Sequence, residues 1–109
     1  MRQFTLLDAT QYGEVVGQSS RDESLNLPYQ VLVKFLGEPH KHGPNFPDDN
    51  GKVDVCWGIQ DTSGNKILIW NYKNGPAYTG HGTIESIEVF SVYVTDQEFF
   101  EELRAALKS

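Results

Sequence analysis

The sequence is poor in cysteine and in basic side chains, and it has no long hydrophobic run. Cys56 has no second cysteine with which to form a disulfide within the chain. Nine Lys and Arg side chains stand against fifteen Asp and Glu, a formal net charge of −6, which disfavours direct binding to nucleic-acid phosphates and to anionic membranes. No apolar segment has transmembrane length, and the run from Phe4 to Leu7 is too short for a signal peptide. We therefore expect a cytoplasmic protein without membrane association.

Recognisable catalytic and cofactor motifs are also missing. The segment 75–82 is rich in glycine, but no Lys-Ser/Thr pair and no helical pattern follow it, so it is not a phosphate loop. The spacing of the soft metal donors does not define a zinc site; these donors are His40, His42, Cys56 and His81. We predict that the protein is not an enzyme and has no catalytic residue, no metal site and no cofactor. A small hydrolase that uses a carboxylate or a histidine is the alternative, and we rank it below a binding function.

The clearest structural signal is a hairpin over residues 53–72. Apolar and polar residues alternate through its first strand, whose apolar positions are Val53, Val55, Trp57 and Ile59. Gly64 and Asn65 tolerate the positive φ that a short hairpin turn needs. The returning strand is apolar on both faces, with Ile67 and Ile69 on one face and Leu68, Trp70 and Tyr72 on the other. Such a strand needs cover on both sides, from the rest of the chain or from a partner.

Five further segments are predicted from the same kinds of pattern. Phe4 to Leu7 predicts a short edge strand, and the polar stretch 12–26 predicts irregular structure. The segment 84–94 predicts a third strand with Ile87 and Val89 on one face; the opposite face carries Phe90, Val92 and Val94. Loops are expected at 40–51 and 74–83.

Two helices complete the prediction. The first covers Tyr29–Leu36, with Asn26 as its N-cap. The second follows a capping box at residues 95–98, in which Thr95 is the N-cap and Glu98 reaches back to it. Its apolar face consists of Phe99, Leu103, Ala106 and Leu107. The pattern predicts one α+β domain over residues 1–109, with an antiparallel sheet of three to four strands packed with an internal short helix and a C-terminal helix.

Aromatic side chains supply the candidate binding site. Tyr and Trp at an exposed sheet surface are typical anchors of interfaces, and we predict a surface that comprises Trp70, Tyr72, Tyr78, His81 and Tyr93. The alternative is that residues 4–16 cover this face. If the face is bare, with Leu68 beside Phe90 and Val92, a homodimer is expected.

Three motifs carry a resemblance to a known group of proteins. They are Phe35-Leu-Gly-Glu-Pro39, Lys52-Val-Asp-Val-Cys-Trp57 and Ile69-Trp-Asn-Tyr-Lys-Asn-Gly75. This pattern resembles a family of small, mostly uncharacterised proteins of tailed bacteriophages. In the third strand the chain departs from that family, with Val89-Phe-Ser-Val-Tyr93 in place of a Trp-x-Ile-Gly-Gly-like segment.

The resemblance implies a non-enzymatic accessory protein that binds a host protein or protein complex in the host cytoplasm and inhibits a host defence system. The alternative is a dimeric protein that binds a small ligand, such as a nucleotide signal. For that function the candidate residues lie in the two loops and are His40, His42, Tyr78 and His81.

Overall fold

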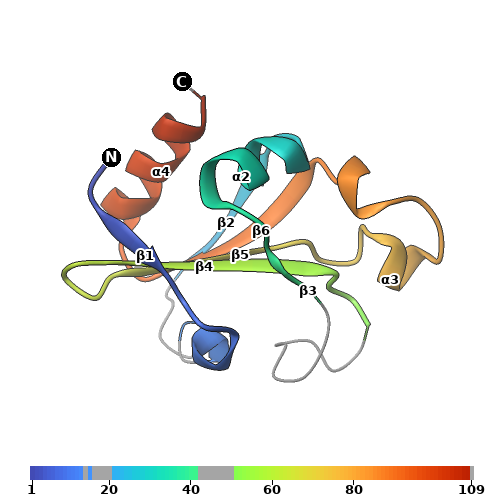
Figure 1. The fold of residues 1–109 in the computed structure, drawn as a ribbon, viewed down its shortest axis with the longest axis horizontal. Helices are drawn as coiled ribbons and strands as arrows, with labels where there is room; N and C mark the ends of the chain where they lie inside the picture. Colours follow the sequence, from blue (N-terminus) through green and yellow to red (C-terminus); the bar gives the residue numbers. More distant parts are fainter. Residues whose placement is uncertain (14, 16–20, 42–50, 109) are drawn as a thin grey trace.

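The computed structural model describes residues 1–13, 15, 21–41 and 51–108 and has an α+β fold (Figure 1). Its strands are β1 (Phe4–Leu6), β2 (Arg21–Asn26), β3 (His40–Lys41), β4 (Val55–Asp61), β5 (Lys66–Trp70) and β6 (Val89–Val94). Its helices are α2 (Tyr29–Leu36), α3 (Pro76–Thr79) and α4 (Gln97–Lys108), and two short 3-10 turns cover Ala9–Gln11 and Ile84–Ser86.

The strands form one antiparallel sheet in the order β1-β4-β5-β6-β2, and β3 pairs with β4. The predicted α+β class, antiparallel sheet and two main helices are confirmed. The predicted strand number of three to four was too low, because β2 and β3 were expected to be irregular. Strand β2 reads Arg-Asp-Glu-Ser-Leu-Asn, so at this edge of the sheet Leu25 is the apolar side chain that enters the core. A polar edge strand lacks the apolar alternation on which the prediction depended.

Helices α2 and α4 cover one face of the sheet (Figure 1). The core on this side combines three groups of buried side chains: Tyr29, Leu32 and Leu36 from α2; Phe99, Phe100, Leu103 and Leu107 from α4; and Val55, Trp57, Ile59, Ile67, Ile69, Phe90, Val92 and Val94 from the sheet. The register pairs Ile69 with Val92, which puts both side chains on this face. The placement of Phe90 and Val92 beside Leu68 was therefore wrong, because register fixes the face of each side chain.

The N-terminal segment covers part of the opposite face. Leu7, Tyr12 and Val15 pack there against buried Cys56 and Leu68. Gly58 makes this close approach possible, since a Cβ at that position would lie 2.5 Å from Cε1 of Tyr12. At the centre of the sheet this face is thus covered by the N-terminal segment, as the alternative to a bare face predicted. The bare face from which a homodimer was expected is filled there by the chain itself.

The N-cap of α2 and the start of the third strand differ from the prediction. Asn26 ends β2 and is not the cap of α2; the backbone N–H of Tyr29, in the first turn, instead donates to the carbonyl of Ile87 at 3.1 Å. The third strand begins at Val89, after the turn at Ile84–Ser86. Ile87 joins the core with Phe90, so the predicted strand alternation does not extend to it.

The cap of α4 was also misassigned. The Asp96 carboxylate accepts a hydrogen bond of 3.0 Å from the backbone N–H of Phe99, which is the N-cap interaction. The hydroxyl of Thr95 accepts a hydrogen bond of 2.7 Å from the backbone N–H of Lys66 and so ties the helix start to β5. Within the described parts of the chain, none of the helices has both the length and the apolar character needed to cross a lipid bilayer.

Candidate functional site

Two exposed tyrosines flank a lysine where the chain leaves β5. Tyr72 is 47% exposed and Tyr78 is 51% exposed. The Lys73 Nζ lies 5.3 Å from the centre of the Tyr72 ring and 5.8 Å from the centre of the Tyr78 ring. Both distances are within the range of cation–π attraction. We call Tyr72, Lys73 and Tyr78 the tyrosine–lysine surface.

The backbone of Lys73 has an uncommon conformation. Its φ is +60°, in the left-handed region, and it is the one residue other than glycine with positive φ among those the structure describes. Lysine in this region costs more than glycine or asparagine. The Lys73 N–H donates to the carbonyl of Lys52 at 2.9 Å, which fixes this turn to the segment that leads into β4.

A buried polar pair holds the turn in place from below. Asn71 is fully buried, and its side-chain oxygen accepts hydrogen bonds from the backbone N–H groups of Asp54 and Val55, at 2.9 and 3.0 Å. Its amide nitrogen donates to the Asp54 carboxylate at 2.9 Å. The other Asp54 carboxylate oxygen accepts from the backbone N–H of Ala77 at 3.0 Å, inside α3. The two ends of the tyrosine–lysine surface are thus anchored to the same carboxylate.

Glycine is required where the chain passes this carboxylate. A Cβ on Gly75 would lie 2.0 Å from the Asp54 Oδ2 and 2.6 Å from the Asn71 Nδ2. Because real Cβ atoms do not approach polar atoms so closely, any other residue would displace the pair or the turn. The glycine in the Asn-Gly-Pro sequence is therefore part of the support for Tyr78.

His81 lies beyond α3 on an exposed turn. The Thr79 hydroxyl donates to the backbone carbonyl of His81 at 2.8 Å, and this bond fixes the main chain while the His81 side chain stays exposed. His40 lies elsewhere, in β3, and its ring is hydrogen-bonded to the Tyr12 hydroxyl. His42 lies outside the described residues. The two described histidines proposed for a small-ligand site, His40 and His81, thus belong to separate elements.

Trp70 and Tyr93 form a second, less exposed pair. Both are half-buried, and their ring centres are 4.3 Å apart in an edge-to-face arrangement. They pack against the cluster that contains Leu68 and Cys56, on the face opposite to the helices. The five predicted residues therefore comprise a half-buried aromatic pair, two exposed tyrosines joined by Lys73, and the exposed His81.

Sequence reasoning missed Lys73. Lysine is common on surfaces, so its identity gives no signal. The signal lay in the turn residues Asn74 and Gly75 directly after an apolar strand, which indicate a sharp change of backbone direction at that point. The side chain that occupies such a turn between two tyrosines can be placed only when the turn geometry is known.

The cavity beside Tyr12 and His40 offers little room for chemistry. It has a volume of about 60 Å³ and is lined in part by Tyr12, His40 and Cys56. Space of this size fits water molecules and not a substrate of ordinary size. Burial raises the pKa of the Cys56 thiol well above its usual value, and burial also raises the pKa of the Tyr12 phenol. Both groups therefore stay protonated and are poor nucleophiles at neutral pH.

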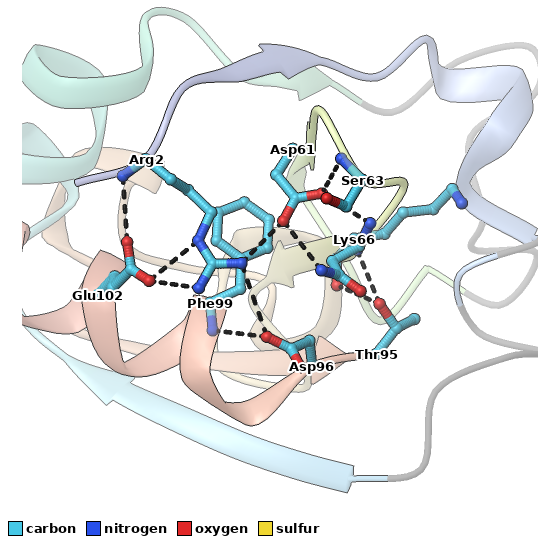
Figure 2. A network of polar contacts seen from close by, with 9 residues as sticks. Arg2, Asp61, Ser63, Lys66, Thr95, Asp96, Phe99 and Glu102 are labelled. Carbon is cyan, nitrogen blue, oxygen red and sulfur yellow. Dashed lines mark hydrogen bonds and ion pairs between the residues drawn. The ribbon is translucent and has the colours of Figure 1, made fainter.

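A charged network lies at the other end of the sheet (Figure 2). Arg2 pairs with Asp61 at 2.9 Å and with Glu102, and its guanidinium lies 5.0 Å from the centre of the Phe99 ring. The network thereby joins the N-terminus to the β4–β5 turn and to α4. A groove of about 570 Å³ lies beside it, and its charged residues, Arg2 and Asp61, neutralise each other. We assign this network to stability.

Metal binding finds no support in the part of the chain that is described. Among those residues, no group of three or more His, Cys, Asp and Glu side chains is arranged to hold a metal ion. No family model matches the chain, and no curated protein or solved structure matches it. Its function therefore has to be inferred from the chemistry of its own residues.

Proposed function

We propose that this chain is a non-enzymatic binding protein and that its partner is another protein, held through the tyrosine–lysine surface. The observation that carries the proposal is the pair of exposed rings of Tyr72 and Tyr78 on a backbone anchored to buried Asp54 and Asn71. Tyrosine gives a large contact area for a small loss of side-chain entropy, and it is enriched among residues that dominate interface energies.

The anchoring of the surface strengthens this proposal. Binding to a loop that must first become ordered costs conformational entropy, whereas a surface that is already fixed avoids that cost. Here the N–H of Lys73 is bonded to the carbonyl of Lys52, and the N–H of Ala77 is bonded to the Asp54 carboxylate. The two tyrosines are therefore presented in a fixed relation before a partner arrives.

The identity of the partner follows from a separate argument. The motifs that resemble small tailed-phage proteins support an accessory role in the host cytoplasm, with a host protein or complex as the target and a defence system as the process inhibited. This part of the proposal depends on the resemblance, and the choice of surface does not.

The test is affinity capture from a nuclease-treated bacterial lysate with immobilised protein. The variant Tyr72→Ala/Tyr78→Ala should lose the proteins that the unmodified chain retains, with at least about a tenfold loss of affinity for any purified partner. Leu6→Ala is the matched control, because Leu6 is 59% exposed and lies on β1. Equal retention by the double variant would refute the proposal, provided that thermal unfolding confirms that each variant is folded.

A small anionic aromatic ligand, such as a nucleotide signal, is the second candidate function. Lys73 between two tyrosine rings favours it, since the rings can stack on a base and the ammonium can meet a phosphate. Mass spectrometry of ligand released by denaturing the purified protein distinguishes the two. A co-purified nucleotide that is lost in the double tyrosine variant would favour this alternative.

The homodimer expected from the sequence remains a prediction. Its original reason has weakened, because Leu68 is buried by the N-terminal segment of the same chain. The half-buried Trp70 and Tyr93 lie on that face, packed against the buried cluster. Light scattering at high protein concentration measures the state directly, and a strict monomer would rule the dimer out.

A further inference from the structure

The ammonium group of Lys73 is held in a defined position. Two rings lie within 6 Å of it, at 5.3 and 5.8 Å, and its backbone is fixed by a hydrogen bond to Lys52. A lysine on an open surface usually samples many rotamers, and ordering it costs free energy when a partner binds. Part of that cost is already met in this turn, which favours recognition of a single negative group.

The conformation of Lys73 provides an independent argument. A left-handed φ of +60° is a local cost that glycine or asparagine would reduce. Residues held in such conformations are concentrated at binding sites, where the strain positions a side chain. A lysine at this position is explained if its positive charge takes part in binding, because that contribution would offset the free-energy cost of the left-handed backbone conformation.

The charged side chains that the structure describes leave the Lys73 ammonium available. Among the described residues no carboxylate forms an ion pair with it. The Asp54 carboxylate is buried, and its two oxygens accept hydrogen bonds from Asn71 and from the N–H of Ala77. Lys73 is thus a positive centre on a surface whose other members are neutral tyrosines.

We infer that the tyrosine–lysine surface recognises an acidic peptide segment, with a carboxylate placed on the Lys73 ammonium and apolar atoms placed on the two tyrosine rings. This inference rests on the proposed function and adds the chemistry of the partner. A peptide is favoured over a nucleic-acid strand because the chain carries a formal net charge of −6, which repels a continuous row of phosphates. One carboxylate within a mixed segment meets much less of that repulsion.

The experiment uses a displayed library of short random peptides, selected on immobilised full-length protein. The overall charge of −6 would by itself select basic peptides, so enrichment of Asp and Glu is a signal of local recognition. The unmodified chain should enrich peptides that contain Asp or Glu. Lys73→Met should lose that acidic bias and bind the selected peptides about fivefold more weakly, since methionine has a similar length and no charge. Lys34→Met, at an exposed position on α2, is the control and should change nothing.

The outcomes separate the two proposals. If peptides are selected through Tyr72 and Tyr78 without acidic bias, or if Lys73→Met binds them equally well, the inference is wrong and the proposed function stands. If the double tyrosine variant selects the same peptides as the unmodified chain, both proposals are wrong. Binding of fluorescently labelled oligo(dT) and oligo(U) is measured as well. Tight binding of either oligonucleotide that depends on Lys73 would overturn the choice of a peptide.

A second measurement uses the backbone of residue 73. Lys73→Gly relieves the left-handed strain and should leave the thermal midpoint unchanged or raised. The same variant should lose the acidic bias in selection. A lysine that served only to stabilise the turn would give the reverse result, with a lowered midpoint and unaltered selection.

Discussion

Asp54 and Asn71 exchange two hydrogen bonds in the interior: the Asp54 N–H donates to the Asn71 side-chain oxygen, and the Asn71 amide donates to the Asp54 carboxylate, both at 2.9 Å. Asp54 is 8% exposed and Asn71 is fully buried. A buried carboxylate is tolerated when each of its oxygens is satisfied, and here the N–H of Ala77 supplies the remaining bond. The pair connects the sheet to the surface that carries Tyr72 and Tyr78.

Removal of the Asn71 side chain should strongly destabilise the protein. Asn71→Ala leaves the N–H groups of Asp54 and Val55 without their acceptor in the interior, and the expected loss is about 3 kcal/mol in the free energy of unfolding. Asn74→Ala is the matched control, because Asn74 is exposed and makes one hydrogen bond to the Val89 carbonyl; its cost should be about 0.5 kcal/mol. Chemical denaturation measures both. Equal losses in the two variants would mean that the buried pair has no special role.

The contact between Gly75 and this pair gives a second prediction. A methyl group at Gly75 would overlap the Asp54 carboxylate, so Gly75→Ala should cost about 2 kcal/mol or more. Gly13→Ala is the control, since a Cβ at Gly13 would meet no atom within 4 Å, and it should be neutral or slightly stabilising. The comparison is made by thermal unfolding. A neutral Gly75→Ala would show that the turn can move away from Asp54 without cost.

The sequence predicted the interior of this fold better than its edges. Strong alternation over residues 53–60 and two-faced apolar character over 66–72 identified the central strands, because burial imposes those patterns directly. The returning strand is shorter than predicted, since β5 ends at Trp70 and leaves Tyr72 outside it. Strand β2 escaped notice because an edge strand needs few apolar residues. The face assigned to Phe90 and Val92 failed for another reason: it depends on register between strands, which the local pattern of one strand does not contain.

The residues of the candidate site were likewise predicted only in part. Tyr72 was predicted as an aromatic residue on the outer face of a strand, and Tyr78 as an exposed residue of the loop 74–83. Neither the half-buried state of Trp70 nor the position of Lys73 could be predicted, since the first depends on packing with Tyr93 and the second on a left-handed turn. Tertiary contacts decide exposure, and exposure decides which aromatic residues are available to a partner.

The correction at the start of α4 can be tested with three variants. Asp96→Ala should cost about 1 kcal/mol, whereas Asp96→Asn should cost less, since asparagine is also a good N-cap. Amide hydrogen exchange locates the effect. Faster exchange is expected at Phe99 in Asp96→Ala, and at Lys66 in Thr95→Ala, because these are the N–H groups that each side chain accepts from. Faster exchange at Phe99 in Thr95→Ala would restore threonine as the cap.

The network around Arg2 predicts how stability depends on pH. Burial raises the pKa of Asp61, but hydrogen bonds from the Asn65 side chain, from Arg2 and from the backbone amides of Asn65 and Ser63 outweigh it, and the pKa falls from 3.8 to about 2. The hydrogen bonds from Arg2 likewise lower the pKa of Glu102. Both shifts mean that the folded state binds fewer protons than the unfolded state.

The sign of the effect follows from those directions. A carboxylate whose pKa is lower in the folded state contributes stability that is complete above its unfolded pKa and is lost as the pH falls toward its folded pKa. For Asp61 the loss should therefore occur between pH 3.8 and about 2. Asp61→Asn should be less stable at neutral pH, should lose less stability over that interval, and should approach the unmodified chain at the acid end.

Chemical denaturation at a series of pH values measures this dependence, with Glu88→Gln, at an exposed position, as the control for loss of one negative charge. Arg2→Gln gives an independent check. It removes a donor that lowers the pKa of Asp61 and of Glu102, so both folded-state pKa values should rise toward their unfolded values. The acid-induced loss of stability should then be smaller, and it should be complete at a higher pH, than in the unmodified chain. If Arg2→Gln leaves the size and the end point of that loss unchanged, Asp61 owes its low pKa to Asn65 and Ser63, and Arg2 fastens the N-terminus to α4 without setting the response to acid.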